Sequence, residues 1–163
     1  MFNRRKLFTP GMTVGLFGGS FDPPHKGHSL VSAKLQAALG LDVVWWLVAP
    51  QNPLKTSSPD SMENRLNACR DLVGSFNHRV YISDEETRLG TRNTADTVRK
   101  LKQIYPQVKF IWLMGADNMA SLHNWKNWQV LMNDIPMAIY PRPGYVVKAC
   151  LLYTSDAADE RHG

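Results

Sequence analysis

The chain is poor in cysteine and has no long apolar run. Only two cysteines, Cys69 and Cys150, occur in 163 residues, which argues against a disulfide framework. We expect Cys69 to be a reduced thiol in the core. No apolar run approaches the roughly 20 residues of a membrane span, and the segment before Met12 lacks the apolar stretch of a secretory signal. These absences predict a cytoplasmic protein that does not associate with membranes.

The charge is positive but dispersed. Lys and Arg number 19 against 14 Asp and Glu, giving a net charge of +5 and a pI near 9.4. The basic residues are spread along the chain, and Arg4 to Lys6 form the one basic run. This pattern favours small phosphorylated ligands over nucleic acid as partners.

Strands and helices are predicted to alternate along one domain, residues 1–149. The apolar runs predict strands at 12–17, 42–48, 79–83, 108–114 and 135–140. A helix is predicted at 26–39, with its period given by Leu30, Ala33 or Lys34, Ala37 and Ala38. Two more are predicted at 60–73, behind an Asp60/Glu63 capping box, and from Thr94 as cap to Tyr105, and residues 84–93 are expected to be a polar connection. The expected fold is an α/β, Rossmann-like parallel sheet with helices on both faces.

The stretch from Val14 to Leu30 is the centre of the sequence. A strand leads into Gly18, Gly19 and Ser20, and a helix follows Pro24. Glycines permit positive φ and close approach of a ligand, and a helix N-terminus attracts anions. We expect a phosphate site here.

His25 and His28 are three residues apart, with Gly27 between them. On a first helical turn they share one face, where imidazoles can hydrogen-bond to phosphate oxygens. The alternative is a strand-turn-helix corner with two solvated histidines, but the preceding Gly-Gly-Ser-Phe-Asp-Pro favours a site.

Two further loops follow predicted strands and share the expected ligand-binding edge. Pro50 to Lys55 follows the second strand, and Gly115 to Asn118 follows the fourth. Lys55 is a candidate phosphate ligand or a solvated loop lysine, and Arg65 on the next helix is a weaker candidate.

The run Gly-x-Phe-Gly-Gly-Ser-Phe-Asp-Pro-x-His-x-Gly-His resembles the signature of the nicotinate-nucleotide adenylyltransferases, within the nucleotidylyltransferase superfamily. The resemblance extends over about residues 13–145. It implies catalytic roles for His25, His28 and Lys55. It also implies a site for ATP and its phosphates made of Gly18, Gly19, Ser20, Phe21, Gly27, Gly115 and Asp117.

The same resemblance implies the second substrate site. Thr91 to Thr97 is similar to a family segment that approaches the pyridine ring, although Asn93 stands where the family has Tyr. Thr94, Asn118 and Trp125 would bind the nicotinate nucleotide, with the Trp125 indole stacking on its ring. Trp128, Trp45 and Trp46 are expected to be structural.

The implied activity is transfer of AMP from ATP to nicotinic acid mononucleotide, giving deamido-NAD and pyrophosphate in NAD biosynthesis. Magnesium would arrive with ATP, and no protein metal site is evident. Because the nucleophilic phosphate is already ionised, the enzyme needs only to align the reactants and stabilise charge.

One family motif, Ile-Ser-Ser/Thr-x-x-Ile-Arg, has no counterpart here. Residues 150–163 resemble read-through of vector or adapter sequence and are expected to be a non-native, poorly packed tail. The alternative function is therefore a catalytically impaired nucleotide-binding fragment of the enzyme. Phosphopantetheine adenylyltransferase ranks lower because it usually has Thr at the position of His25, and a dinucleotide oxidoreductase would need Gly-x-Gly-x-x-Gly.

Overall fold

The computed structural model describes residues 7–50, 61–74, 79–141 and the backbone of 150–152. Its centre is a six-stranded sheet with the order β3-β2-β1-β4-β5-β6. Five strands are parallel, and β6 pairs antiparallel with β5 at the edge. The strands are β1 (Thr13–Gly19), β2 (Val43–Val48), β3 (Val80–Ser83), β4 (Lys109–Gly115), β5 (Met137–Tyr140) and β6 (Cys150–Leu152).

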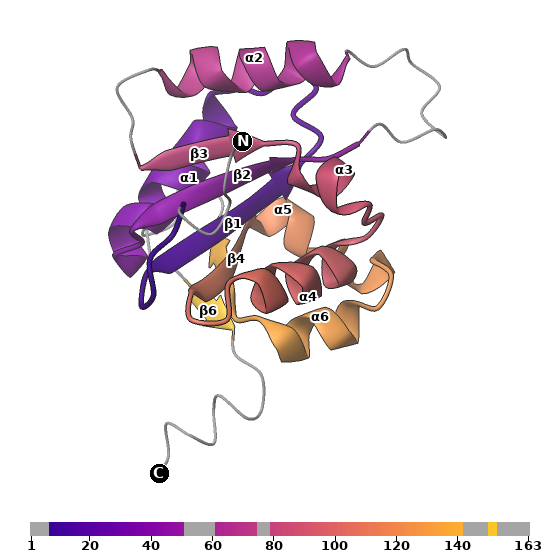
Figure 1. Cartoon of the computed structure of the whole chain (residues 1–163). Coiled ribbons are helices and arrows are strands. Elements are labelled where there is room, and N and C mark those ends of the chain that lie inside the picture. The colour runs from indigo at the N-terminus through magenta and orange to yellow at the C-terminus, as the bar shows by residue number, and fades with distance from the viewer. Residues whose placement is uncertain (1–6, 51–60, 75–78, 142–149, 153–163) are drawn as a thin grey trace.

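Helices cover both faces of the sheet, which confirms the predicted Rossmann-like fold (Figure 1). One face carries α1 (Lys26–Leu39) and α2 (Met62–Val73), and the other carries α4 (Thr94–Ile104) and α6 (Trp128–Asp134). Three short elements lie in the connections: α3 (Glu85–Leu89), α5 (Ala116–Met119) and the 3-10 turn η2 (Leu122–Asn124).

Strand alternation divides the apolar side chains between two cores. In β2, Trp45 packs with the α4 and α6 side of the sheet, whereas Trp46 packs with the α1 and α2 side. Both indoles are 0% exposed, as expected for structural residues. Successive residues of a strand point to opposite faces, so a run of apolar residues in β2 fills both cores.

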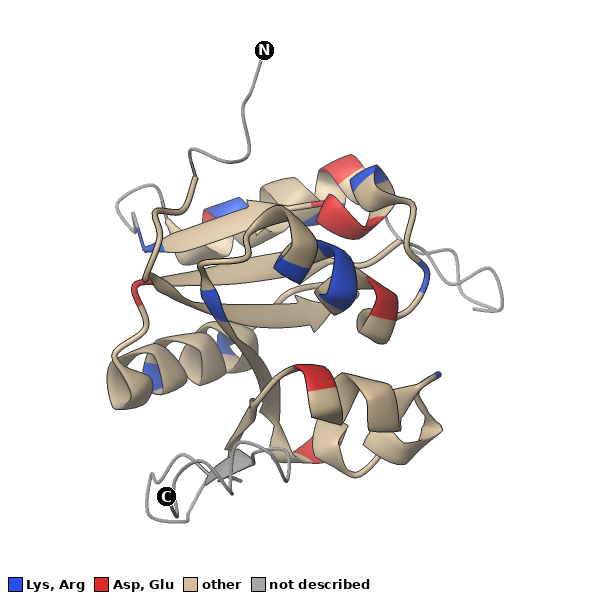
Figure 2. Cartoon of the chain, turned by 60° about the horizontal axis from the view of Figure 1, so that its bottom comes forward, with Lys and Arg blue, Asp and Glu red and all other residues tan. Residues whose placement is uncertain are grey.

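Charged side chains lie on the helices and connections. In the view of Figure 2 acidic positions lie among basic ones, while the strands are almost entirely free of both. None of the helices in the described ranges combines the length and hydropathy that crossing a bilayer requires.

Three local predictions were wrong. Residues 85–89 form α3 rather than a polar connection. Ser61, not Asp60, caps α2, because its side chain accepts from the Asn64 N–H. Asn93, not Thr94, caps α4 by accepting from the Asp96 N–H. Each cap is a short polar side chain one residue away from the predicted one, where its oxygen reaches a free amide of the first turn.

The buried face of α1 also differs from the predicted one. Leu30 is 43% exposed, whereas Ser32 and Gln36 are buried. Ser32 accepts a hydrogen bond from Trp46 Nε1 at 2.9 Å, and Gln36 donates to the Arg79 carbonyl at 3.2 Å. Because these polar groups have partners across the interface, they can occupy the core face.

The predicted domain end, residue 149, lies immediately before β6. Residues 153–163 lie outside the described part of the chain. The assignment of 150–163 to a non-native tail therefore stays a prediction.

Cys69 should resist alkylation in the folded chain. The side chain is free and 0% exposed, and burial raises the pKa of its thiol to about 11. At pH 8 the thiol is therefore protonated and shielded, and only the thiolate is nucleophilic. We expect iodoacetamide to label Cys69 in urea but not in buffer, as read by peptide mass spectrometry. Equal labelling rates in both conditions would show that α2, which carries Cys69, does not pack as described.

Candidate active site

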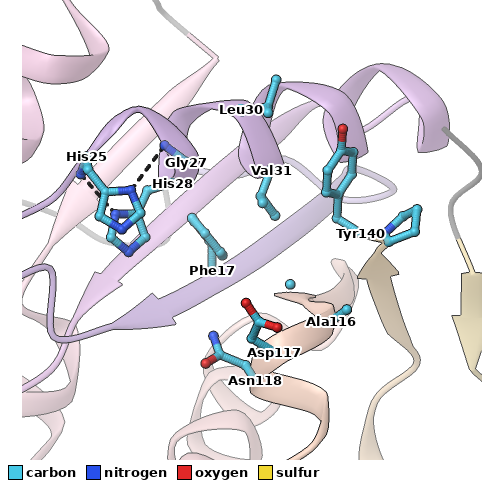
Figure 3. A pocket seen from close by; sticks show the side chains of 12 residues that line it. Phe17, His25, Gly27, His28, Leu30, Val31, Ala116, Asp117, Asn118 and Tyr140 are labelled. Atoms are coloured by element: carbon cyan, nitrogen blue, oxygen red, sulfur yellow. Dashed lines mark hydrogen bonds between the residues drawn. The ribbon is translucent and has the colours of Figure 1, made fainter. Parts of the chain in front are cut away.

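A cavity of about 320 Å³ opens where β1 and β4 end side by side at the centre of the sheet (Figure 3). The chain runs outward from β1 to β2 and β3 and then crosses to β4. In open α/β sheets ligands bind at such a reversal of strand order, outside the carboxyl ends of the strands. The cavity is lined by Phe17, His25, Gly27, His28, Leu30, Val31, Gly115, Ala116, Asp117, Asn118, Tyr140 and Pro141.

The glycines after Phe17 do not form a turn. Gly18 and Gly19 continue β1 and do not have positive φ, contrary to expectation. A Cβ on Gly18 would lie 2.6 Å from the Trp112 ring, and one on Gly19 would lie 3.4 Å from the Phe21 ring. The positive φ, +48°, belongs to Phe21. The missing side chain of Gly18 thus makes room for the Trp112 ring, whereas a Cβ on Gly19 would be at ordinary contact distance from Phe21.

Phe21 itself is buried. Its side chain is 1% exposed and stacks on Trp46, with ring centroids 5.0 Å apart and an angle of 9° between the planes. Because the ring is covered, a ligand can contact only the backbone of Phe21. Ser20, by contrast, is exposed beside it.

The two histidines form a capping box at the start of α1. His25 is the N-cap, and its Nδ1 accepts from the Gly27 N–H at 3.1 Å. The His25 N–H in turn donates to Nδ1 of His28 at 3.0 Å. The rings are tilted by 32° to each other, with centroids 3.9 Å apart. The sequence predicted the bounds of this helix and the shared face of the two histidines, but not these reciprocal bonds.

These bonds determine where each imidazole carries its proton. An Nδ1 that accepts from a backbone N–H cannot itself be protonated, so a neutral ring must carry its hydrogen on Nε2. Burial, and secondarily the neighbouring His25, lowers the pKa of His28 to about 4. At neutral pH His28 is therefore an uncharged ring with Nε2–H as a donor for an anion in the cavity.

The other wall of the cavity comes from the end of β4. Gly115 caps α5, and Asp117 and Asn118 lie exposed on that short helix. Figure 3 shows both side chains on the side of the cavity opposite α1. Tyr140, at the end of β5, closes a third side. The cavity thus joins donors on α1 to a carboxylate and an amide on α5.

Arg65, a candidate phosphate ligand, is instead buried and bonded to the backbone. Its side chain is 2% exposed, and Nη1 donates to the Ser20 carbonyl at 2.9 Å and to the Ala49 carbonyl at 2.7 Å. Since Ser20 follows β1 and Ala49 follows β2, this guanidinium joins two loops at the ligand-binding edge.

The chain matches known proteins over most of its length. The cytidylyltransferase-like family model matches residues 16–160. A protein of Ruegeria sp. (strain TM1040), named a probable nicotinate-nucleotide adenylyltransferase, is 52% identical over 140 residues, which are 86% of this chain and 73% of the relative. A protein of the same name from Parvibaculum lavamentivorans is 49% identical over 149 residues, 91% of this chain and 73% of its own. The chain belongs to the nicotinate-nucleotide adenylyltransferase family.

A solved structure has the same fold as this member of the nicotinate-nucleotide adenylyltransferase family. Plasmodium falciparum nicotinic acid mononucleotide adenylyltransferase, complexed with NaAD, superposes with a TM-score of 0.71 over 84% of this chain and 68% of its own, at 20% identity. The relatives confirm the family resemblance found in the sequence, and the superposition confirms the predicted fold.

The family site residues predicted from the sequence separate into groups. His25, Gly27, His28, Gly115, Asp117 and Asn118 meet in one cavity. Thr94 and Trp125 do not line it; their neighbours Asn93 and Lys126 line a second cavity of about 400 Å³. Trp125 is half-buried and packs edge-on against Trp112, with centroids 6.2 Å apart. Lys55 lies outside the described residues.

Sequence reasoning missed the apolar wall of the cavity. Leu30 and Val31 lie on α1, and Tyr140 ends the last parallel strand. The position of Tyr140 at a strand end was a usable signal, because the other two loops were found in that way. In the described ranges, no group of three His, Cys, Asp or Glu side chains could hold a metal ion.

Proposed function

We propose that this chain transfers AMP from ATP to nicotinic acid mononucleotide, releasing deamido-NAD and pyrophosphate. The observation that carries the proposal is the pair of adjacent imidazoles, both with Nδ1 bonded to backbone N–H groups, at the start of α1 and beside the end of β4. The names of the relatives agree with this reaction. The cytoplasmic location expected from the sequence stays a prediction.

The reaction requires no general base. A phosphate oxygen of the mononucleotide forms a bond to the α-phosphorus of ATP, and the bond from that phosphorus to the bridging oxygen breaks. Its electrons leave with pyrophosphate, whose negative charge grows in the transition state. Catalysis of such a step consists of alignment and electrostatic stabilisation.

His28 supplies the central hydrogen bond in this mechanism. Its ring is neutral at pH 7, so Nε2–H donates to a phosphate oxygen without first taking up a proton. His25 offers a second Nε2–H, and the dipole of the 14-residue α1 favours negative charge at the same end. Asp117 lies across the cavity, where it can accept from ribose hydroxyls of ATP.

The remaining assignments follow the family resemblance. Magnesium arrives as the complex with ATP and neutralises phosphate charge as part of that substrate. The phosphates bind to the backbone of Gly18, Gly19, Ser20 and Phe21, and Lys55 lies near them as a further ligand. Thr94, Asn118 and Trp125 bind the nicotinate nucleotide.

The direct test is release of pyrophosphate by the full chain. Purified protein is given ATP, magnesium and nicotinic acid mononucleotide, with the corresponding amide mononucleotide as the matched control. We expect release that depends on the acid mononucleotide, together with deamido-NAD in equal amount by chromatography. Binding of ATP without release of pyrophosphate from either mononucleotide would contradict the proposal and support the alternative, an impaired nucleotide-binding fragment.

A further inference from the structure

A column of aromatic rings leads from the core between β2 and α1 to the histidine pair. The column consists of Trp46 on β2, Phe21 and His28. The Trp46 and Phe21 rings are stacked at 5.0 Å, and the Phe21 ring centroid lies 4.8 Å from that of His28. His28 then contacts His25 at 3.9 Å. The buried core is thereby in contact with the imidazole that lines the cavity.

Both ends of this column are fixed. At the inner end, Trp46 Nε1 donates to Ser32 Oγ at 2.9 Å, and both residues are buried. At the outer end, Nδ1 of His28 accepts from the His25 N–H. Phe17 packs edge-on against Phe21, Trp46 and His28, with centroids 5.7, 5.5 and 6.2 Å away. Aromatic pairs of this kind have defined geometry, so they restrict the rotation of the imidazole.

The backbone accepts an unusual conformation to place Phe21 in this column. Its φ of +48° is uncommon for a bulky residue. Strained conformations persist where the surrounding structure holds them in place, and here the stacked indole does so.

We propose that Phe21 and Trp46 are positioning residues for His28, with Ser32 fixing the indole that supports them. The column packs against the His28 imidazole and holds it in the orientation in which Nδ1 accepts from the His25 N–H. Nε2 is then available to a phosphate oxygen in the cavity. Phe21 would thus act through His28 rather than by contacting ATP with its ring. The inference rests on the proposed function only for its effect on turnover.

The column also explains why His28 stays uncharged. Burial is the larger cause of its lowered pKa, and the rings of Phe17, Phe21 and Trp46 supply that burial. The other titratable groups lining the cavity are His25 beside it, Asp117 from α5 and Tyr140 from β5. Loosening the column admits water to the ring and should raise its pKa toward the ordinary value.

The test compares two matched serine variants. Ser32→Ala removes the partner of Trp46 Nε1, and Ser83→Ala removes the partner of Trp45 Nε1, which donates to Ser83 Oγ at 2.8 Å on the opposite face of the sheet. Both indoles are 0% exposed, so both variants leave a buried donor unsatisfied at a similar cost in stability. Only Ser32 is linked to His28, through the rings of Trp46 and Phe21.

The readout is the pKa of His28, measured by NMR titration of the histidine-labelled full chain and assigned with His28→Gln. We expect a value near 4 in the wild type and in Ser83→Ala, and a rise of about one unit or more in Ser32→Ala. Phe21→Leu should raise it further, because the contacting ring itself is lost. Equal pKa values for His28 in the two serine variants would overturn the proposal, whether or not Phe21→Leu folds.

Turnover gives a second, separable readout. If the wild type is active, Ser32→Ala should lower kcat with little change in the KM for ATP, while Ser83→Ala changes neither. If the wild type releases no pyrophosphate, the proposed function fails, but the His28 titration still decides the positioning role. An unchanged kcat in an active Ser32→Ala variant would contradict the positioning role.

Discussion

We expect His28→Ala to lower kcat for pyrophosphate release by about 10²- to 10³-fold, the usual loss when one preorganised donor is removed from an active site. The reason is that Nε2–H of His28 is fixed before the substrate arrives, with Nδ1 held by the His25 N–H at 3.0 Å. A donor aimed at growing negative charge acts on the transition state more than on bound ATP. The KM for ATP should therefore change much less than kcat in steady-state assays.

The capping role of His28 requires its own control. Alanine also removes the acceptor of the His25 N–H, which destabilises the start of α1. His28→Gln places an amide oxygen at the same helical position, so it should restore the melting temperature without restoring kcat. His123→Ala, an exposed histidine on η2, should leave kcat unchanged. Recovery of full turnover in His28→Gln would show that the histidine acts only as a cap.

The strands were predictable because their signal is local. The apolar run Val43–Val48 indicates a strand buried on both faces whatever packs against it, and β2 has those bounds. The same holds for β1 and β4, whose predicted ends differ from the observed ones by two residues or fewer. Once the strands were placed, the rule that ligands bind at carboxyl ends identified the Gly115 to Asn118 loop, which lines the cavity opposite the start of α1.

The phase of α1 was not predictable from local pattern. Its periodicity indicated Leu30 on the core face, yet Ser32 and Gln36 are buried and Leu30 is exposed. The polar pair is stabilised by Trp46 and the Arg79 carbonyl, which are 14 and 43 residues away from their partners in the sequence. No hydropathy pattern contains that information, because it depends on which distant groups the fold brings together.

The place of the Phe21 ring was not predictable for a related reason. The motif alone indicates neither the positive φ of Phe21 nor the core residue on which its ring stacks. Stacking on Trp46, 25 positions further on, takes the ring out of the site. The His25 and His28 capping box, by contrast, could have been predicted, since a side-chain acceptor at the N-cap with another three residues later is a local signature.

Arg65→Met should lower the free energy of unfolding by about 2 to 4 kcal/mol. Methionine fills a similar volume but leaves the Ser20 and Ala49 carbonyls without the charged donor that joins them. Hydrogen bonds to charged groups are worth more than neutral ones, and each carbonyl left unpaired carries a desolvation cost. Urea unfolding of the full chain, followed by tryptophan fluorescence, measures the change.

Arg70→Met on the same helix is the matched control. Arg70 is exposed and its Nη1 lies 3.4 Å from Asn67 Oδ1, so its replacement should change stability by less than about 0.5 kcal/mol. Equal losses in the two variants would show that the Arg65 bonds do not stabilise the fold. Because Ser20 follows β1 in the phosphate loop, Arg65→Met should also lower kcat under conditions where the variant remains fully folded. A guanidinium that contacts no ligand would then control the reaction through the two loops that it holds together.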